Sequence, residues 1–244
     1  MAAKVNSPLA VLGTDIEYTA RFEATAQLGP HMLISVTTPR TEFEHVPVPL
    51  KGEHQAANCG LVLAILDRLR ERGVPIKERD AIHGLARTRT SARLEQIFAQ
   101  PRIFVDGAHN PESIQALMKS LGAHMRYDSL IVIFGCAADK DVNAMLRQLG
   151  SGADKVIFTR ADNNARACEP KDLLRKFSEY SSKMAQTAGS VKDAINIAAK
   201  AAGRDDLIVV TGSFYVAGEA KRLLDEKKSR DGHIRVGANS PART

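Results

Sequence analysis

The ten residues Arg102-Ile103-Phe104-Val105-Asp106-Gly107-Ala108-His109-Asn110-Pro111 decide the fold of this chain. The apolar run 103–105 leads into a loop that carries Asp106, His109 and Asn110, and a proline then introduces a helical pattern. Proline is favoured at the first position of a helix, and α/β sheets bind ligands where a strand ends and a helix begins. The stretch therefore predicts a strand, a ligand-binding loop and a helix in succession.

From Pro101 onward, short apolar runs alternate with amphipathic helical patterns. This alternation favours right-handed βαβ units, and so a mostly parallel sheet with helices on both faces. The expected fold class is α/β, with a Rossmann-like domain. The expected strands are 102–105, 130–134, 155–159, 184–187 and 207–210, and the expected helices are 111–121, 141–149, 170–180, 191–202 and 215–226.

The first hundred residues indicate a different organisation. They suggest short strands, for which an antiparallel arrangement is one option, near 11–13, 22–24, 31–36 and 46–50, and helices at 52–72 and 77–85. These few elements would bury too little apolar surface to form a stable core by themselves. We therefore interpret them as the remnant of a larger domain. We predict a partial domain over 1–98, with 86–100 as connector, a Rossmann-like domain over 99–226 and a disordered tail over 227–244.

Composition limits the function classes. With 244 residues, 44% hydrophobic and 25% charged, and no apolar stretch near membrane-spanning length, the chain is expected to be globular, cytoplasmic and without a membrane partner. A net charge of +6 suits anionic ligands, but no tryptophan and 5% aromatic residues disfavour nucleic-acid binding. Three cysteines without a Cys-x-x-Cys pair argue for reduced thiols, and we expect no metal ligands among them.

Polar residues follow several of the expected strands, where they would share one edge of the sheet. Asp106 could hold a ribose hydroxyl or an ion and His109 an anionic group, although a helix-capping aspartate and a solvent-facing histidine are equally consistent with the spacing. The Asn110-Pro111 helix start favours an anion site. Lys140, between two aspartates, could receive a carboxylate or phosphate, or only form a charged helix turn.

Two further positions leave alternatives open. Ser213 follows the last strand, where it either joins the site or serves only as a helix N-cap. His54 and Asn58 lie one turn apart on a helix, where they could contact a nucleobase or phosphate, or form a solvated polar face.

The order of these motifs resembles the folylpolyglutamate synthase and dihydrofolate synthase family of the Mur ligase superfamily. The matching segments run from about residue 11 to 221, and they are 50–58, 93–95, 106–111, 135–141 and 211–215. Gly107-Ala108-His109-Asn110 after the aspartate separates this family from its peptidoglycan-ligase relatives. The resemblance implies a Mur ligase C-terminal domain, preceded by the remnant of a Mur ligase central domain.

The resemblance also implies an ATP-dependent ligase, with Mg²⁺, that adds L-glutamate to a folate-type substrate through an acyl phosphate. The site residues that the resemblance implies would position the substrates and neutralise their charge. None of them is assigned a covalent catalytic role. By similarity, the nucleotide would contact Asn58, Arg93 and Asp106, and the glutamate would contact His109, Lys140 and Ser213.

Two departures from the family pattern concern the phosphate site and one turn. No segment fits the phosphate loop G-x-x-x-x-G-K-[ST], so the family's main ATP and Mg²⁺ residues have no match here. Thr90-Ser91-Ala92 stands where the family carries Trp-Pro-Gly, and an alanine there could alter a turn that needs positive φ, and with it the aim of Arg93.

Three functional hypotheses follow. The first is the C-terminal part of a folate ligase, inactive alone and completed by other residues or by a separate P-loop polypeptide. The second is a non-catalytic glutamate- or nucleotide-binding module, or half-enzyme partner. The third, a Mur-type ligase acting on a cell-wall precursor, is disfavoured by Gly107 to Asn110.

Overall fold

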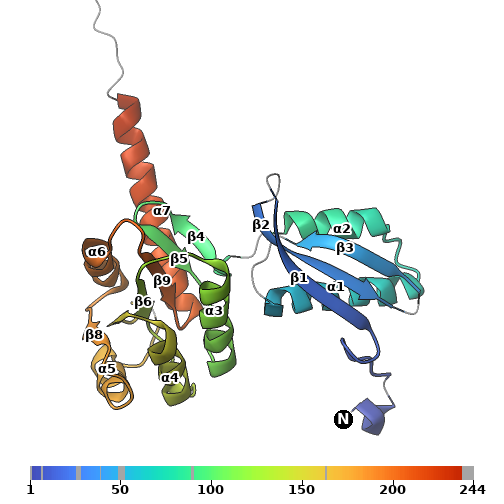
Figure 1. Cartoon of the computed structure of the whole chain (residues 1–244), viewed down its shortest axis with the longest axis horizontal. Helices are drawn as coiled ribbons and strands as arrows, with labels where there is room; N and C mark the ends of the chain where they lie inside the picture. The colour runs from blue at the N-terminus through green and yellow to red at the C-terminus, as the bar shows by residue number, and fades with distance from the viewer. Residues whose placement is uncertain are drawn as a thin grey trace, which may run out of the picture. The chain divides into compact units, whose positions relative to one another are not determined.

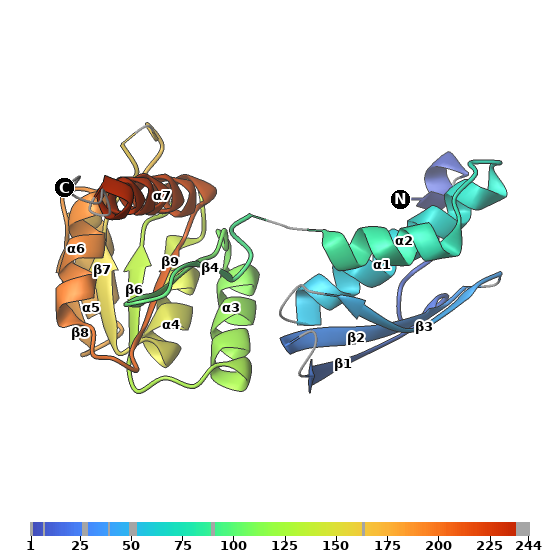
Figure 2. The same cartoon turned by 90° about the horizontal axis from the view of Figure 1, so that it is seen from above.

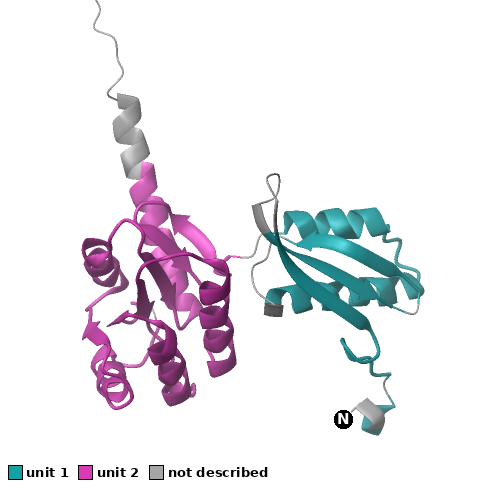
Figure 3. Ribbon diagram, in the orientation of Figure 1, with its two compact units in different colours: residues 1–90 teal, residues 91–244 magenta. Residues whose placement is uncertain are grey.

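The chain divides into two compact units, residues 1–90 and 91–244 (Figure 3). The computed structural model describes residues 2–6, 8–25, 29–38, 40–48, 53–88, 91–162 and 164–237. The division falls before the boundary expected at 98/99, because β4 (Glu95–Phe98) pairs with the strand that follows it.

Unit 1 is an antiparallel sheet with helices on one face (Figures 1 and 2). A short 3₁₀ helix (Ala2–Val5) precedes its elements, which are β1 (Glu17–Thr25), β2 (Gly29–Thr37), β3 (Glu42–Val48), α1 (Glu53–Glu71) and α2 (Glu78–Arg87). The antiparallel option is confirmed. Alternate residues Met32, Ile34 and Val36 are buried in the core with the helices, as the period of two in a strand requires.

Two expectations for unit 1 need comment. The run 11–13 is not part of a strand: Leu12 makes an isolated bridge to Ile16, and Gly13, at φ +86°, turns the chain. Pro49, Leu50 and the expected helix start at Gly52 lie outside the described residues.

Unit 2 is the expected α/β domain. In the described part of the chain its strands lie in the order β4-β5-β9-β6-β7-β8, and every neighbouring pair is parallel except β4 with β5. The strands after β4 are β5 (Arg102–Val105), β6 (Leu130–Phe134), β7 (Lys155–Phe158), β8 (Met184–Thr187) and β9 (Leu207–Thr211). β4 lies in the segment 86–100 that we expected to be a connector. The sequence did not reveal this strand, because four residues are too few to show the alternation of a strand.

Helices cover both faces of this sheet, so β6 and β9 are buried along their whole length. Residues of α3 (Pro111–His124), α4 (Val142–Gly152) and α5 (Pro170–Ser178) share one core, and residues of α6 (Val191–Ala201) and α7 (Phe214–Gly237) share the other (Figure 2). No helix within the described residues combines the length and apolar character needed to cross a membrane.

The last helix corrects one expectation. α7 continues to Gly237, through most of the segment predicted as a disordered tail, and residues 238–244 lie outside the described part. A helix does not need hydrophobic periodicity where its residues favour helix and its charges pair along the surface. Arg222 pairs with Glu226, and Lys228 with Asp225.

Two glycines let the loops at the carboxyl edge of the sheet approach one another. Val105 pairs with Val210 and Phe134 with Thr211, so three neighbouring strands end at the same edge. A Cβ on Gly135 would lie 2.3 Å from the carbonyl oxygen of Thr159. A Cβ on Gly212, whose φ is +100°, would lie 2.7 Å from the carbonyl oxygen of Gly135. Backbone atoms cannot move aside as a side chain can, so these positions need glycine.

We predict that Gly135→Ala lowers the free energy of unfolding by about 2–3 kcal/mol, because the new methyl group collides with backbone. Gly122→Ala is the matched control: its Cβ would meet nothing within 4 Å, on the exposed side of α3. It should stabilise the helix by about 0.5–1 kcal/mol. Urea unfolding followed by circular dichroism measures both values, and equal effects would contradict the role given to Gly135.

Candidate functional site

The side chain of Asp106 joins two loops at the carboxyl edge. It lies directly after β5 and is 6% exposed. Its Oδ2 accepts a hydrogen bond from the Leu94 amide and its Oδ1 one from the Ala108 amide, both at 2.8 Å. A buried carboxylate needs such donors, and hydrogen bonds to a charged group are stronger than neutral ones. Asp106 therefore holds the loop of Arg93 against the loop of His109.

The loop around Arg93 is held in an unusual backbone conformation. Ala92 has φ +54° and Leu94 φ +45°, which residues with a Cβ rarely adopt. The Gly107 amide donates to the Ala92 carbonyl at 2.8 Å, and the Ala92 amide donates to Glu95 Oε2 at 2.9 Å. The turn keeps a positive φ although alanine stands there and could have altered it, because the surrounding hydrogen bonds hold Ala92 in a conformation that glycine adopts without strain.

Lys221 of α7 secures this loop from outside. Its Nζ lies 2.7 Å from Glu95 Oε1 and 3.3 Å from Ser91 Oγ. Burial raises the pKa of Glu95, but the hydrogen bonds from Lys221 and from the Ala92 amide outweigh it and hold that pKa below its ordinary value. This contribution to stability is therefore present at neutral pH and is lost as the pH falls through the lowered pKa.

Phe214, at the start of α7, brings the two loops together. The guanidinium carbon of Arg93 lies 5.1 Å from the centre of the Phe214 ring, and the ring centres of His109 and Phe214 are 5.7 Å apart. A Cβ on Gly107 would lie 2.3 Å from Phe214 Cε1, so glycine makes room for the ring. We did not identify Phe214 as a site residue from the sequence. The available signal was an aromatic residue directly after Ser213 at the expected site edge.

The tautomer of His109 follows from its contact. Nδ1 lies 2.8 Å from the Gly107 carbonyl oxygen. Since a carbonyl can only accept, Nδ1 carries the hydrogen, and Nε2 is the ring nitrogen left to meet a ligand. A carboxylate at Nε2 would need a donor there as well, and so the imidazolium form of His109.

The start of α3 is capped from within the helix. Asn110 Oδ1 accepts from the Ser113 amide at 2.8 Å, and Ser113 Oγ accepts from the amides of Asn110 and His109 at 3.1 and 3.0 Å. Asn110, and not Asp106, is thus the cap, and together with Ser113 it forms a capping box. These three amides are engaged by the helix cap, although we expected the helix start to favour an anion.

The remaining predicted site residues take no part in the ring contacts among Arg93, His109 and Phe214 in the described part of the chain. Ser213 is 6% exposed, and its Oγ accepts from the Val216 amide at 3.2 Å, as in an N-cap. Lys140 follows β6, with its Nζ 3.6 Å from Asp139 Oδ2. Asn58 is exposed on α1 in unit 1, and the side chain of His54 lies outside the described residues. The structure thus brings Arg93, Asp106 and His109 together, and the ligand contacts of all six residues stay predictions.

A pair of thiols lies beside the same edge. Cys136 follows Gly135, and Cys168 donates its amide to the Cys136 carbonyl at 2.9 Å. A hydrogen bond from the Cys136 thiol, aided by Lys176 and opposed by burial, lowers the pKa of Cys168 to about 7, whereas the same bond and burial raise the pKa of Cys136. Within the described residues no group of three or more His, Cys, Asp or Glu could hold a metal ion.

We predict that Asp106→Asn lowers the free energy of unfolding by about 1–3 kcal/mol and speeds hydrogen exchange at the Leu94 amide, because one acceptor becomes a donor facing backbone N–H. Exchange measured by mass spectrometry or NMR reports the loop directly. Asp141→Asn, at the exposed cap of α4, is the control and should leave Leu94 exchange unchanged. Unchanged exchange in Asp106→Asn would contradict the role of this carboxylate.

We predict that alkylation of Cys168 by iodoacetamide rises with pH through a midpoint near 7, because the thiolate is the nucleophile. Cys136→Ala removes the hydrogen bond and should move the midpoint upward. Buried Cys59, whose pKa is raised by burial, should react slowly at every pH tested. Peptide mass spectrometry separates the three sites, and a Cys168 midpoint near 9 in the unmodified chain would refute the prediction.

Comparison with known proteins assigns the chain to a family. Residues 92–214 match the family described as "Mur ligase, glutamate ligase domain". The dihydrofolate synthase/folylpolyglutamate synthase of Mycobacterium tuberculosis is 31% identical over 198 residues, which cover 75% of this chain and 40% of that protein. A probable bifunctional folylpolyglutamate synthase/dihydropteroate synthase of Haloferax volcanii is 32% identical over 177 residues, 72% of this chain and 20% of that protein.

A solved structure of a relative has the same fold as this chain. The Mycobacterium tuberculosis folylpolyglutamate synthase complexed with ADP superposes with a TM-score of 0.81 at 26% identity, over 91% of this chain and 50% of that one. The chain therefore spans half or less of the length of these relatives. It belongs to the Mur ligase family through its glutamate ligase domain, and folylpolyglutamate and dihydrofolate synthases are among its homologues.

Proposed function

We propose that this chain is the glutamate-domain part of an ATP-dependent ligase that joins L-glutamate to a folate through an acyl phosphate. The observation that carries the proposal is the cluster of Arg93, Phe214 and His109 at the carboxyl edge, held by buried Asp106. It presents a fixed cation and an imidazole where α/β sheets bind ligands. The two relatives and the solved structure described above are named as folylpolyglutamate or dihydrofolate synthases, and the solved one is complexed with ADP.

The residues suit two anionic ligands. Arg93, stacked on Phe214, offers a guanidinium that matches a phosphate, and Asp106 positions it through the Leu94 amide. His109 through Nε2, Lys140 through Nζ and Ser213 through its hydroxyl would bind the carboxylates of glutamate, and Ser213 Oγ caps the helix at the same time. Asn58 would meet the nucleotide from α1. These side chains bind and orient their ligands, and so raise the effective concentration of the amine near the activated carboxyl group.

Magnesium and the terminal phosphates of ATP would need residues beyond these. Within the described residues no cluster of ligands could hold a metal ion, and no glycine in the 244 residues is followed by lysine, as the phosphate loop requires. We therefore propose that the chain works with the P-loop half of the family fold, carried by other residues of the same polypeptide or by a separate one.

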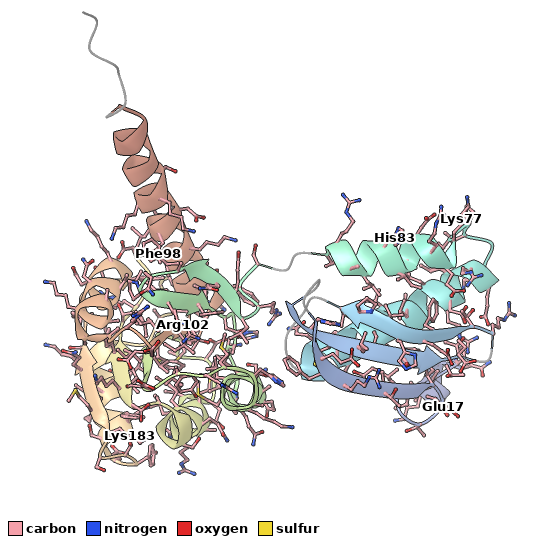
Figure 4. The ribbon with its side chains drawn as sticks, turned by 45° about the horizontal axis from the view of Figure 1, so that its top comes forward. Glu17, Lys77, His83, Phe98, Arg102 and Lys183 are labelled. Atoms are coloured by element: carbon pink, nitrogen blue, oxygen red, sulfur yellow. The ribbon has the colours of Figure 1, made fainter. Side chains whose placement is uncertain are left out.

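We predict that the purified chain shows no glutamate- and folate-dependent release of ADP from ATP, and that adding the P-loop half of a relative restores it. Arg93→Ala and His109→Ala should lower the restored rate at least about tenfold, roughly the effect of losing one charged hydrogen bond. Lys183→Ala is the control, because Lys183 precedes β8 and so lies at the amino end of the parallel strands, away from their carboxyl ends (Figure 4). Turnover by the chain alone would refute the need for the other half.

The second candidate is a glutamate- or nucleotide-binding module without catalysis. The absent Gly-Lys pair favours it, because binding at Arg93 and His109 does not require a phosphate loop. Calorimetry with glutamate and a nonhydrolysable ATP analogue separates the two candidates. Binding without restored turnover supports the module, and binding of neither ligand excludes it.

A further inference from the structure

Two free thiols of unit 2 lie opposite each other on segments that run side by side. Cys136 comes two residues after β6, and Cys168 comes two residues before α5. Ala137 and Ala167 form an antiparallel bridge, which sets the register of the two segments. In that register Cys136 faces Cys168, and the Cys168 amide donates to the Cys136 carbonyl at 2.9 Å. The two cysteines are therefore directly opposite residues of a short antiparallel ladder.

Opposite residues of an antiparallel ladder have the geometry that a disulfide needs. Their side chains point to the same side of the ladder, and their Cα atoms are about 5.5 Å apart where a hydrogen bond joins the pair. Disulfides span Cα separations of roughly 4.4–6.8 Å. A hydrogen bond between the thiols of Cys136 and Cys168 already places their sulfur atoms within reach of one another. The two sulfurs can thus be joined with only a small approach of the segments.

The two thiols differ in their access to solvent. Cys136 is 1% exposed and belongs to the core that lies beneath α3, α4 and α5. Cys168 is only partly buried, at the margin of the same core. A dissolved oxidant therefore reaches Cys168 first, and Cys136 is the shielded thiol next to it. An accessible thiol beside a second one that can resolve its oxidised form is typical of redox-sensing cysteines.

The surroundings of Cys168 favour its thiolate. The hydrogen bond from Cys136 lowers the pKa of Cys168 most, and Lys176 on α5 lowers it further. Burial and the carboxylates of Asp172 and Asp139 oppose this shift, and the resulting pKa is about 7. The same hydrogen bond and burial raise the pKa of Cys136, which keeps its proton. Since the thiolate is the nucleophile, Cys168 is the thiol that attacks an oxidant at neutral pH.

We propose that Cys136 and Cys168 form an oxidation site, at which hydrogen peroxide converts the two thiols into a disulfide. The Cys168 thiolate attacks one peroxide oxygen, the O–O bond breaks, hydroxide leaves, and Cys168 becomes a sulfenic acid. The Cys136 sulfur then attacks the Cys168 sulfur, the S–O bond breaks, and the leaving oxygen takes the Cys136 proton to form water. The two sulfurs lose two electrons, and the peroxide gains them.

The disulfide fastens the base of the loop that follows β6. In the reduced protein this loop is held to the opposite segment by backbone hydrogen bonds, among them the one from the Ala138 amide to the Arg166 carbonyl at 2.8 Å. Arg166 also lies 3.8 Å from Asp139 in an ion pair on the surface. A covalent bond adds a restraint that such exposed contacts do not supply. The oxidation site follows from the thiols alone and does not depend on the proposed function.

The test treats the purified full chain with hydrogen peroxide at neutral pH, removes the peroxide, unfolds the chain in urea and alkylates the remaining thiols. Peptide mass spectrometry without reductant should show one linked pair of peptides, joined through Cys136 and Cys168, which dithiothreitol separates. Cys59 is the internal control: it is 4% exposed in the core of unit 1 and should be recovered as an alkylated thiol. Hydrogen exchange at the Ala138 amide should slow at least about threefold in the oxidised chain.

Two variants separate the steps. In Cys136→Ala the reaction should stop at the sulfenic acid of Cys168, which dimedone traps at that residue. In Cys168→Ala, Cys136 should stay a thiol, with its oxidation at least about tenfold slower than disulfide formation in the unaltered chain. Circular dichroism checks that both variants fold, and the peptide map of the unaltered chain needs no variant.

Three results would overturn the proposal. The first is an unaltered chain that keeps Cys136 and Cys168 reduced under peroxide, or that links two chains instead of these two thiols. The second is Cys168 converted to sulfinic acid while Cys136 stays reduced, because the shielded thiol would then fail to reach the sulfenic acid. The third is oxidation of Cys59 as fast as that of Cys168, because the fold would then confer no selectivity. None of these readouts uses ligase activity, so failure of the proposed function leaves them unchanged.

Discussion

The carboxylate of Asp106 is the interaction on which the carboxyl edge of unit 2 depends. With one oxygen on the Leu94 amide and the other on the Ala108 amide, it joins a loop before β5 to the loop after it. The loop before β5 contains two residues at positive φ, and such a conformation persists only where surrounding contacts impose it. The position of Arg93 is therefore a consequence of a buried charge twelve residues beyond Leu94.

Three glycines and the ring of Phe214 allow the loops at the carboxyl edge to pack closely. Gly135 and Gly212 allow backbones to meet at distances that a Cβ would forbid, and Gly107 leaves room for Phe214. The Phe214 ring then lies within reach of both Arg93 and His109. Such contacts are each worth about 0.5–1 kcal/mol at an exposed site, too little to build the site alone but enough to orient side chains on a rigid frame.

The two units differ in how far helices cover their sheets. The sheet of unit 2 has helices on both faces and two cores, so its strands need no further partner. Unit 1 has one core on one face of a three-stranded sheet, and α1 keeps apolar side chains exposed on its far side. Such a small sheet with a single layer of helices buries little apolar surface, which is why its sequence read as part of something larger.

The sequence alone determined the α/β class, the parallel sheet of unit 2 and the placing of Asp106 to Pro111 at the end of a strand, because periodicity and turn residues are local signals. The order of its motifs also indicated the family, and the comparison with the family's pattern pointed to a turn at Ala92 that needs positive φ. The sequence did not reveal β4, the length of α7, or Phe214 between Arg93 and His109. The pairing of β4 with β5 and the packing of Phe214 were decided by the tertiary structure, because neither leaves a periodic signal in the sequence. The length of α7 was missed because its last turns lack an apolar repeat, although its charges pair at helical spacing. The hydrogen bonds of Asn110 and Ser213 likewise appear only in the tertiary structure, where both side chains cap helices, and the ligand contact of Ser213 stays a prediction.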